Sequence, residues 1–144
     1  MKKIYVFLIA ILVGLLCTAN QCNKDDCHKS ITFVNNSLKE VYIHAGWYHD
    51  TLNFSSFFPN PYDQPNLYRV KSGESNNNGF GVRKKDCLEN KVAQGNAFMY
   101  VFDSEVLSTI SWGTVEENYM VLKTYHPTLE EMENNDWTIY FTGE

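Results

Sequence analysis

The chain has 144 residues and a formal net charge of −5, and 44% of its residues are hydrophobic and 15% aromatic. This length fits a single domain with one core. An acidic protein is repelled by nucleic acid and by anionic lipid headgroups, so we expect no nucleic-acid partner.

The N-terminus has the pattern of a secretory signal peptide. Met1-Lys2-Lys3 is a short basic segment, and residues 4–17 form an apolar run that is too short to span a bilayer, which takes about 20 residues. We therefore predict a signal peptide over residues 1–21, a linker over 22–29 and a single domain over 30–144. Loss of the leader removes Lys2 and Lys3, which leaves 10 basic and 17 acidic residues and a formal charge of −7.

Two cleavage positions fit the leader. Cys17-Thr18-Ala19 resembles a small-x-small site for ordinary signal peptidase, which would release a soluble periplasmic or secreted protein. The other position lies before Cys22, which would then carry lipid and anchor the protein to a membrane. The cysteine count favours lipidation, because Cys17 is lost with the leader and a lipidated Cys22 leaves Cys27 and Cys87 as a pair. A Cys22–Cys27 bridge with Cys87 free is the alternative.

Short apolar segments with alternating or β-branched residues predict a mainly β domain. The first two, 31–34 and 41–45, predict a hairpin joined by an Asn/Ser turn. Residues 97–102 form the most apolar run after the leader and predict a central strand. We expect an antiparallel, immunoglobulin-like β-sandwich of seven or eight short strands. The other predicted strands are 67–70, 79–82, 119–125 and 137–142.

Helices play a small part in this prediction. Thr128 and Glu131 have the spacing of a capping box, which predicts a short helix over 129–134. Asp103 predicts a capped helical turn over 104–107, and Thr114 has the spacing to begin another turn. One or two short helices are therefore expected.

Residues 46–66 are rich in aromatic residues and end in three prolines. Prolines at this density predict a long loop without a central strand or a helix. Its aromatic residues either form an exposed surface that binds glycan or protein, or fold over the core as a lid. The candidate binding residues are Trp47, Tyr48, Phe57, Phe58 and Tyr62. Asp50-Thr51-Leu52 resembles the acceptor motif of bacterial O-glycosylation, which makes Thr51 a candidate modification site.

No motif predicts an enzyme. The sequence lacks a G-x-S-x-G elbow, a P-loop and a dinucleotide fingerprint. His44, His49 and Asp50 are metal-ligand types, but no HExxH pattern or second histidine pair accompanies them, so surface or capping roles are favoured. We predict no catalytic residue, no metal site and no cofactor.

Two resemblances indicate a location. Cys22-Asn23-Lys24-Asp25-Asp26 resembles the tag behind the lipidated cysteine that sends some Gram-negative lipoproteins to the cell surface. Residues 31–37, 112–115, 119–125 and 137–140 resemble segments of small uncharacterised lipoproteins from anaerobic gut-type Gram-negative bacteria. The resemblance implies a lipid-anchored protein at the outer membrane or cell surface, and it implies no activity and no functional residues.

Overall fold

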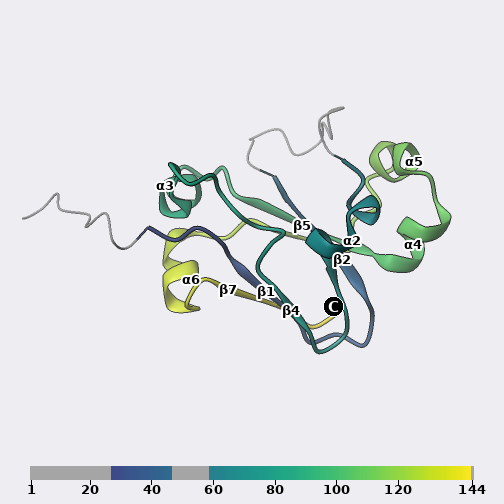
Figure 1. The fold of residues 1–144 in the computed structure, drawn as a ribbon, viewed down its shortest axis with the longest axis horizontal. Coiled ribbons are helices and arrows are strands. Elements are labelled where there is room, and N and C mark those ends of the chain that lie inside the picture. The colour runs from purple at the N-terminus through teal and green to yellow at the C-terminus, as the bar shows by residue number, and fades with distance from the viewer. Residues whose placement is uncertain (1–26, 47–58, 144) are drawn as a thin grey trace, which may run out of the picture.

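A computed structural model describes residues 27–46 and 59–143 (Figure 1). Several predicted features lie outside these residues. They are the signal peptide, the lipidation site Cys22, the candidate glycosylation site Thr51, and four candidate binding residues, Trp47, Tyr48, Phe57 and Phe58.

The described residues form seven strands in two sheets. The three-stranded sheet has the order β4-β1-β7 and the four-stranded sheet has the order β3-β2-β5-β6. The strands are β1 (Thr32–Asn35), β2 (Val41–Gly46), β3 (Arg69–Val70), β4 (Ser75–Asn76), β5 (Phe98–Asp103), β6 (Lys123–Tyr125) and β7 (Thr138–Phe141).

Five short α-helices and one 3-10 helix accompany the strands in the described part of the chain. They are η2 (Pro61–Asp63), α2 (Pro65–Tyr68), α3 (Leu88–Ala93), α4 (Ser104–Thr109), α5 (Trp112–Glu117) and α6 (Leu129–Asn134). Among the described residues, no helix is long and apolar enough to cross a membrane.

The main core lies between the two sheets. Phe33 of β1 and Ile139 of β7 belong to the same buried cluster as Ile43 of β2 and Val101 of β5. Phe33, Ile43 and Val101 are fully buried. These side chains meet because alternate residues of a strand point to the same face of its sheet.

The other face of the four-stranded sheet is also buried. Tyr42 and Phe102 lie on that face and pack with Leu107 of α4 and Val115 of α5 in a second cluster. All six residues of β2 are therefore buried. The result is three layers, with a sheet on one side, the four-stranded sheet in the middle and helices on the other side (Figure 1).

The predicted hairpin of the first two strands is wrong. β1 pairs with β4 and β7, whereas β2 pairs with β3 and β5, so the two strands belong to different sheets. The turn between them is built around Asn35, which is fully buried and bonds to the carbonyl oxygens of Lys39 and Val70 at 2.7 and 3.0 Å. This turn carries the chain from one sheet to the other.

The fold contains more helix than predicted. The proline-rich segment contains η2 and α2. Each helix begins with a proline, and a proline is tolerated at this position because the N–H of the first residue makes no hydrogen bond within the helix. Helix α3 was not predicted, and its N-cap residue Cys87 makes no side-chain capping bond. α5 begins after Ser111 rather than at Thr114, because the Ser111 hydroxyl accepts from the Thr114 N–H at 3.3 Å.

Strand pairing also differs from the prediction. β1 and β7 are parallel, with Phe33 opposite Ile139, so the expected all-antiparallel arrangement is wrong for this pair. Within 119–125 only β6 is a strand, and within 79–82 the only pairing is an isolated bridge from Gly81 to Ser30. The architecture is mixed α/β with substantial strand content.

Three local predictions are confirmed. β5 is the apolar strand expected at 97–102, and it pairs with β2 and β6 on its two sides. The Asp103 side chain accepts from the Glu105 N–H at 2.8 Å and caps α4. α6 covers the predicted residues 129–134, and both bonds of the Thr128–Glu131 capping box are present.

Candidate functional site

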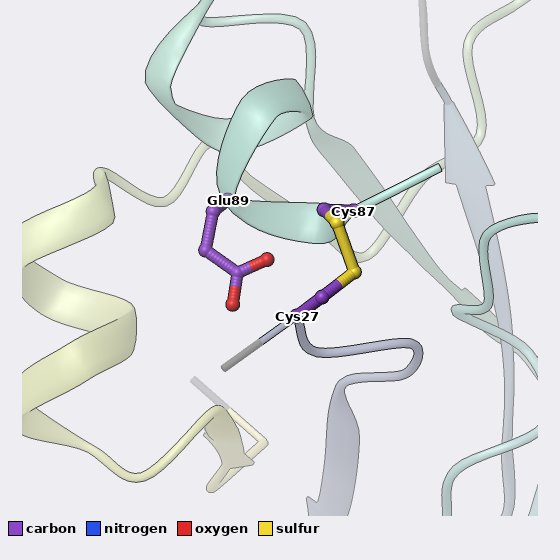
Figure 2. A group of neighbouring side chains, drawn as sticks. All are labelled: Cys27, Cys87 and Glu89. Carbon is purple, nitrogen blue, oxygen red and sulfur yellow. A yellow bond between two sulfur atoms is a disulfide. The ribbon is translucent and has the colours of Figure 1, made fainter. Parts of the chain in front are cut away.

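A disulfide joins the start of the described chain to the start of α3. Cys27 and Cys87 are 60 residues apart, with their Cα atoms at 5.2 Å and their sulfurs bonded. Figure 2 shows the bridge with Glu89, which follows Cys87 in the first turn of α3. The pairing of Cys27 with Cys87 is thus confirmed.

Lys29 adds a polar clamp beside the disulfide. Its Nζ donates to the carbonyl oxygens of Lys84 and Asp86 at 3.0 and 2.7 Å, and lies 2.9 Å from the Cys27 sulfur. The backbone of residues 84–86 therefore binds the side chain of Lys29. This contact fixes the first residues of the domain against the loop that precedes α3.

His28 completes the attachment. Its backbone N–H and ring Nδ1 contact Glu89 Oε1 at 2.9 and 2.6 Å, and its ring stacks on Trp137 with centroids 4.5 Å apart. Burial raises the pKa of Glu89, but the hydrogen bonds from His28 outweigh it and hold that pKa below its usual value. Glu89 therefore stays ionised and holds the histidine in place.

Cys27, Cys87 and Glu89 bring three ligand-type atoms within 4.8 Å of one another. A metal ion is bound by the thiolate form of cysteine, and a disulfide offers none. With the bridge closed, this group works as an attachment point rather than a metal centre.

His44 sits inside the domain, contrary to the surface or capping role that was expected for it. His44 lies on β2 and is 9% exposed. Its ring stacks on Tyr68 with centroids 4.9 Å apart, and its Nδ1 lies 2.9 Å from the carbonyl oxygen of Ala45. Burial lowers the pKa of His44 to about 4, against a smaller opposing effect of the Ala45 carbonyl. The imidazole is therefore neutral at pH 7. His49 and Asp50, its sequence neighbours in the metal hypothesis, lie outside the described residues.

Tyr62 is the one candidate binding residue that the structure describes. It belongs to η2, is 39% exposed, and packs against Tyr42 with ring centroids 5.3 Å apart. One side of the ring thus covers the second core cluster while the remainder faces solvent. Whether the aromatic segment forms a binding surface stays a prediction.

Apolar side chains are exposed around α5, where the sequence predicted a helical turn from Thr114 and a strand over 119–125 but no apolar surface. Eight large apolar side chains are exposed in the described residues, and four of them lie between residues 110 and 122. We call this group the α5 surface. It consists of Ile110, Tyr119, Met120 and Leu122, each 37–44% exposed. The sequence signal for this surface was the pair of apolar residues Met120 and Leu122. They were assigned to a strand, but in the structure they precede β6 and are exposed.

A cavity of about 370 Å³ lies beside α6, between β6 and β7. These two strands are edge strands of different sheets, and the Tyr125 hydroxyl donates across the gap to the Tyr140 carbonyl at 3.1 Å. The cavity is lined by residues 124–127 and 138–140 and by Glu131, Met132 and Asn135. It was not predicted, because it is formed by segments that meet only in the folded chain.

Comparison with known protein families, curated proteins and solved structures finds no match to this chain.

Removal of the disulfide should cost much of the domain's stability. In the loop-entropy treatment, opening a loop of 60 residues lowers the free energy of unfolding by about 4 kcal/mol. A Cys27→Ser/Cys87→Ser variant should therefore melt roughly 10–20 °C lower in a calorimetric scan. A reducing agent should bring the wild type to the same melting temperature and leave the variant unchanged. Equal stability of the variant and the oxidised wild type would contradict this role.

Acid should destabilise the protein through His44. Its pKa is about 4 in the folded state and about 6.5 in an unfolded chain. Between these values only the unfolded state binds the proton, so stability falls as the pH drops from about 6.5 to 4, by about 3 kcal/mol in total. Urea unfolding at several pH values measures this. A His44→Gln variant should lose this part of the decline, and an unchanged decline in that variant would refute the assignment.

Proposed function

We propose that this protein is a lipid-anchored binding module that works outside the cytoplasm and takes a protein partner at the α5 surface. The observation that carries the proposal is the exposure of four large apolar side chains within one short segment. Exposed apolar groups that gather on a soluble domain are typical of interaction sites.

The anchor is proposed from the sequence around Cys22. The apolar leader, the tag-like residues 22–26 and the cysteine count all favour lipid on Cys22. The disulfide is consistent with this, because it uses both remaining cysteines after Cys17 and Cys22, and because disulfides persist in oxidising compartments. The outer membrane or cell surface is the location that we propose.

The orientation of the domain supports the choice of the α5 surface. Figure 1 places α4 and α5 at one end of the molecule, and the start of the described chain at the other end with α3 and α6. A chain tethered a few residues before Cys27 would therefore present α5 away from the membrane. The two sheets pack around one core, which supports a sandwich-like body between the two ends of the domain.

A protein fits the α5 surface better than a glycan. Ile110, Met120 and Leu122 are not aromatic, and stacking on sugar rings requires the flat face of an aromatic side chain. Exposed Glu105 and Glu117 lie in the neighbouring helices and favour a partner with basic residues near its apolar contact. Glycan binding is the second candidate, because Tyr62 and Tyr119 are each 39% exposed.

The anchor can be tested by mass and by partitioning. The mature wild-type protein should begin at Cys22, carry acyl mass and enter the detergent phase, since one lipid-modified cysteine dominates its membrane affinity. A Cys22→Ala variant should appear in the aqueous phase. A wild-type N-terminus at Asn20 without acyl mass would establish the soluble alternative instead.

The α5 surface can be tested by photocrosslinking on intact cells. A photoreactive side chain placed at Met120 should give a discrete protein adduct, and the same group at Leu38, which is 97% exposed, should not. Ile110→Ser/Leu122→Ser should reduce the adduct by about tenfold or more, because it removes two apolar contacts. The same adduct from both positions would contradict the proposal. Loss of the adduct on adding free oligosaccharide would favour the glycan candidate.

A further inference from the structure

We propose that the free edge of β7 and the adjoining cavity bind an extended peptide, which adds to the sheet as a parallel strand. This site lies beside α6, and its lining residue Thr124 is hydrogen-bonded to Tyr119 of the α5 surface at 3.0 Å. The proposal nevertheless requires neither the lipid anchor nor binding of a partner at the α5 surface. Peptides bind in this way when a sheet edge offers unpaired backbone groups next to a pocket for a side chain.

The register of β7 fixes which backbone groups face outward. The Thr32 N–H donates to the Trp137 carbonyl at 3.0 Å, and the Asn36 N–H donates to the Phe141 carbonyl at 2.8 Å. Because residues alternate along a parallel ladder, the backbone groups of Ile139 and Phe141 and the carbonyl of Trp137 face β1. Thr138 and Tyr140 therefore turn theirs away from the sheet.

Two of the four outward groups are already used. The Thr138 N–H donates to the Asn135 carbonyl at 3.0 Å, and the Tyr140 carbonyl accepts from the Tyr125 hydroxyl at 3.1 Å. The Thr138 carbonyl and the Tyr140 N–H remain, and neither has a hydrogen-bond partner within residues 27–46 and 59–143. The edge is therefore partly closed and leaves one acceptor and one donor, two residues apart.

This pair of groups selects the direction of the added strand. In a parallel ladder, a residue opposite Ile139 donates its N–H to the Thr138 carbonyl and accepts from the Tyr140 N–H. An antiparallel strand needs both backbone groups of one residue, and at Thr138 and Tyr140 one of the two is already taken. The edge therefore fits a parallel peptide that forms two hydrogen bonds through one residue.

The cavity accepts the side chain of that residue. In a sheet, the residue opposite Ile139 points to the same face as Ile139, which is buried and lines the cavity with Met132 and Tyr125. A volume of about 370 Å³ holds a leucine side chain. Glu131 of the adjacent helix is exposed and lines the cavity, and its negative charge favours a basic residue beside that leucine.

The test uses the peptide acetyl-Lys-Leu-Lys-amide and the mature protein, in detergent micelles, with ¹⁵N-labelled tyrosine. The Tyr140 amide signal should move downfield and saturate as the peptide is added, with a dissociation constant on the order of 0.1–1 mM. The same peptide with N-methylleucine keeps the side chain but cannot donate to Thr138. It should bind about tenfold more weakly.

Two substitutions test the edge from the protein side. Tyr140→Pro removes the N–H donor at a position where an edge strand accepts proline, and it should abolish binding, followed on the Tyr125 amide signal. Tyr140→Ala keeps the backbone N–H and should retain most of the peptide affinity. Tyr125→Phe releases the Tyr140 carbonyl, which can then accept from the carboxamide of the peptide, so affinity should rise by a few-fold.

Three results would overturn the proposal. They are an unmoved Tyr140 amide signal at millimolar peptide, equal binding of the N-methylated peptide, and equal effects of Tyr140→Pro and Tyr140→Ala. A Tyr140 shift that depends on protein concentration without peptide would assign the edge to a second copy of this chain instead.

Discussion

The buried amide of Asn35 is the interaction that the two-sheet arrangement depends on. Its Nδ2 donates to the carbonyl oxygens of Lys39 and Val70, and its Oδ1 accepts from the backbone and hydroxyl of Ser37 at 3.0 and 2.6 Å. The side chain of a β1 residue is thus bonded to β3 of the other sheet. A buried amide that lost these partners would bear the full cost of desolvation, so the turn has one favourable conformation.

That turn determines what surrounds the central sheet. Because the chain leaves β1 and enters a different sheet, β2 pairs with β5 and is buried on both faces. The three-stranded sheet covers one face, and α4 and α5 cover the other through Leu107 and Val115. The helices are short, yet they are required, because a sheet with apolar residues on both faces must be covered on both.

The two ends of the domain have different character. At one end the disulfide, Lys29 and the stack of His28 on Trp137 fasten the entering chain to α3 and to the start of β7. The same strand then lines the cavity beside α6. At the other end, apolar side chains around α5 remain exposed. Figure 1 shows α3 and α6 near one end of the long axis and α4 and α5 near the other, so the attachment point beside α3 is separated from helix α5.

The sequence by itself determined the features that depend on neighbouring residues or on counting. The capping box at Thr128 predicted α6, and the apolar run predicted β5. The cysteine count favoured the Cys27–Cys87 pair over a Cys22–Cys27 bridge, on the expectation that Cys22 carries lipid, and the structure contains the favoured pair. The tertiary structure decided the partners of each strand, the parallel pairing of β1 with β7, and the cavity between two strand edges. Helix α3 also became evident only in the tertiary structure, because its N-cap residue Cys87 makes no side-chain capping bond that the sequence could indicate. These features arise from contacts between segments far apart in the chain, where burial of the whole core, rather than local preference, selects the arrangement.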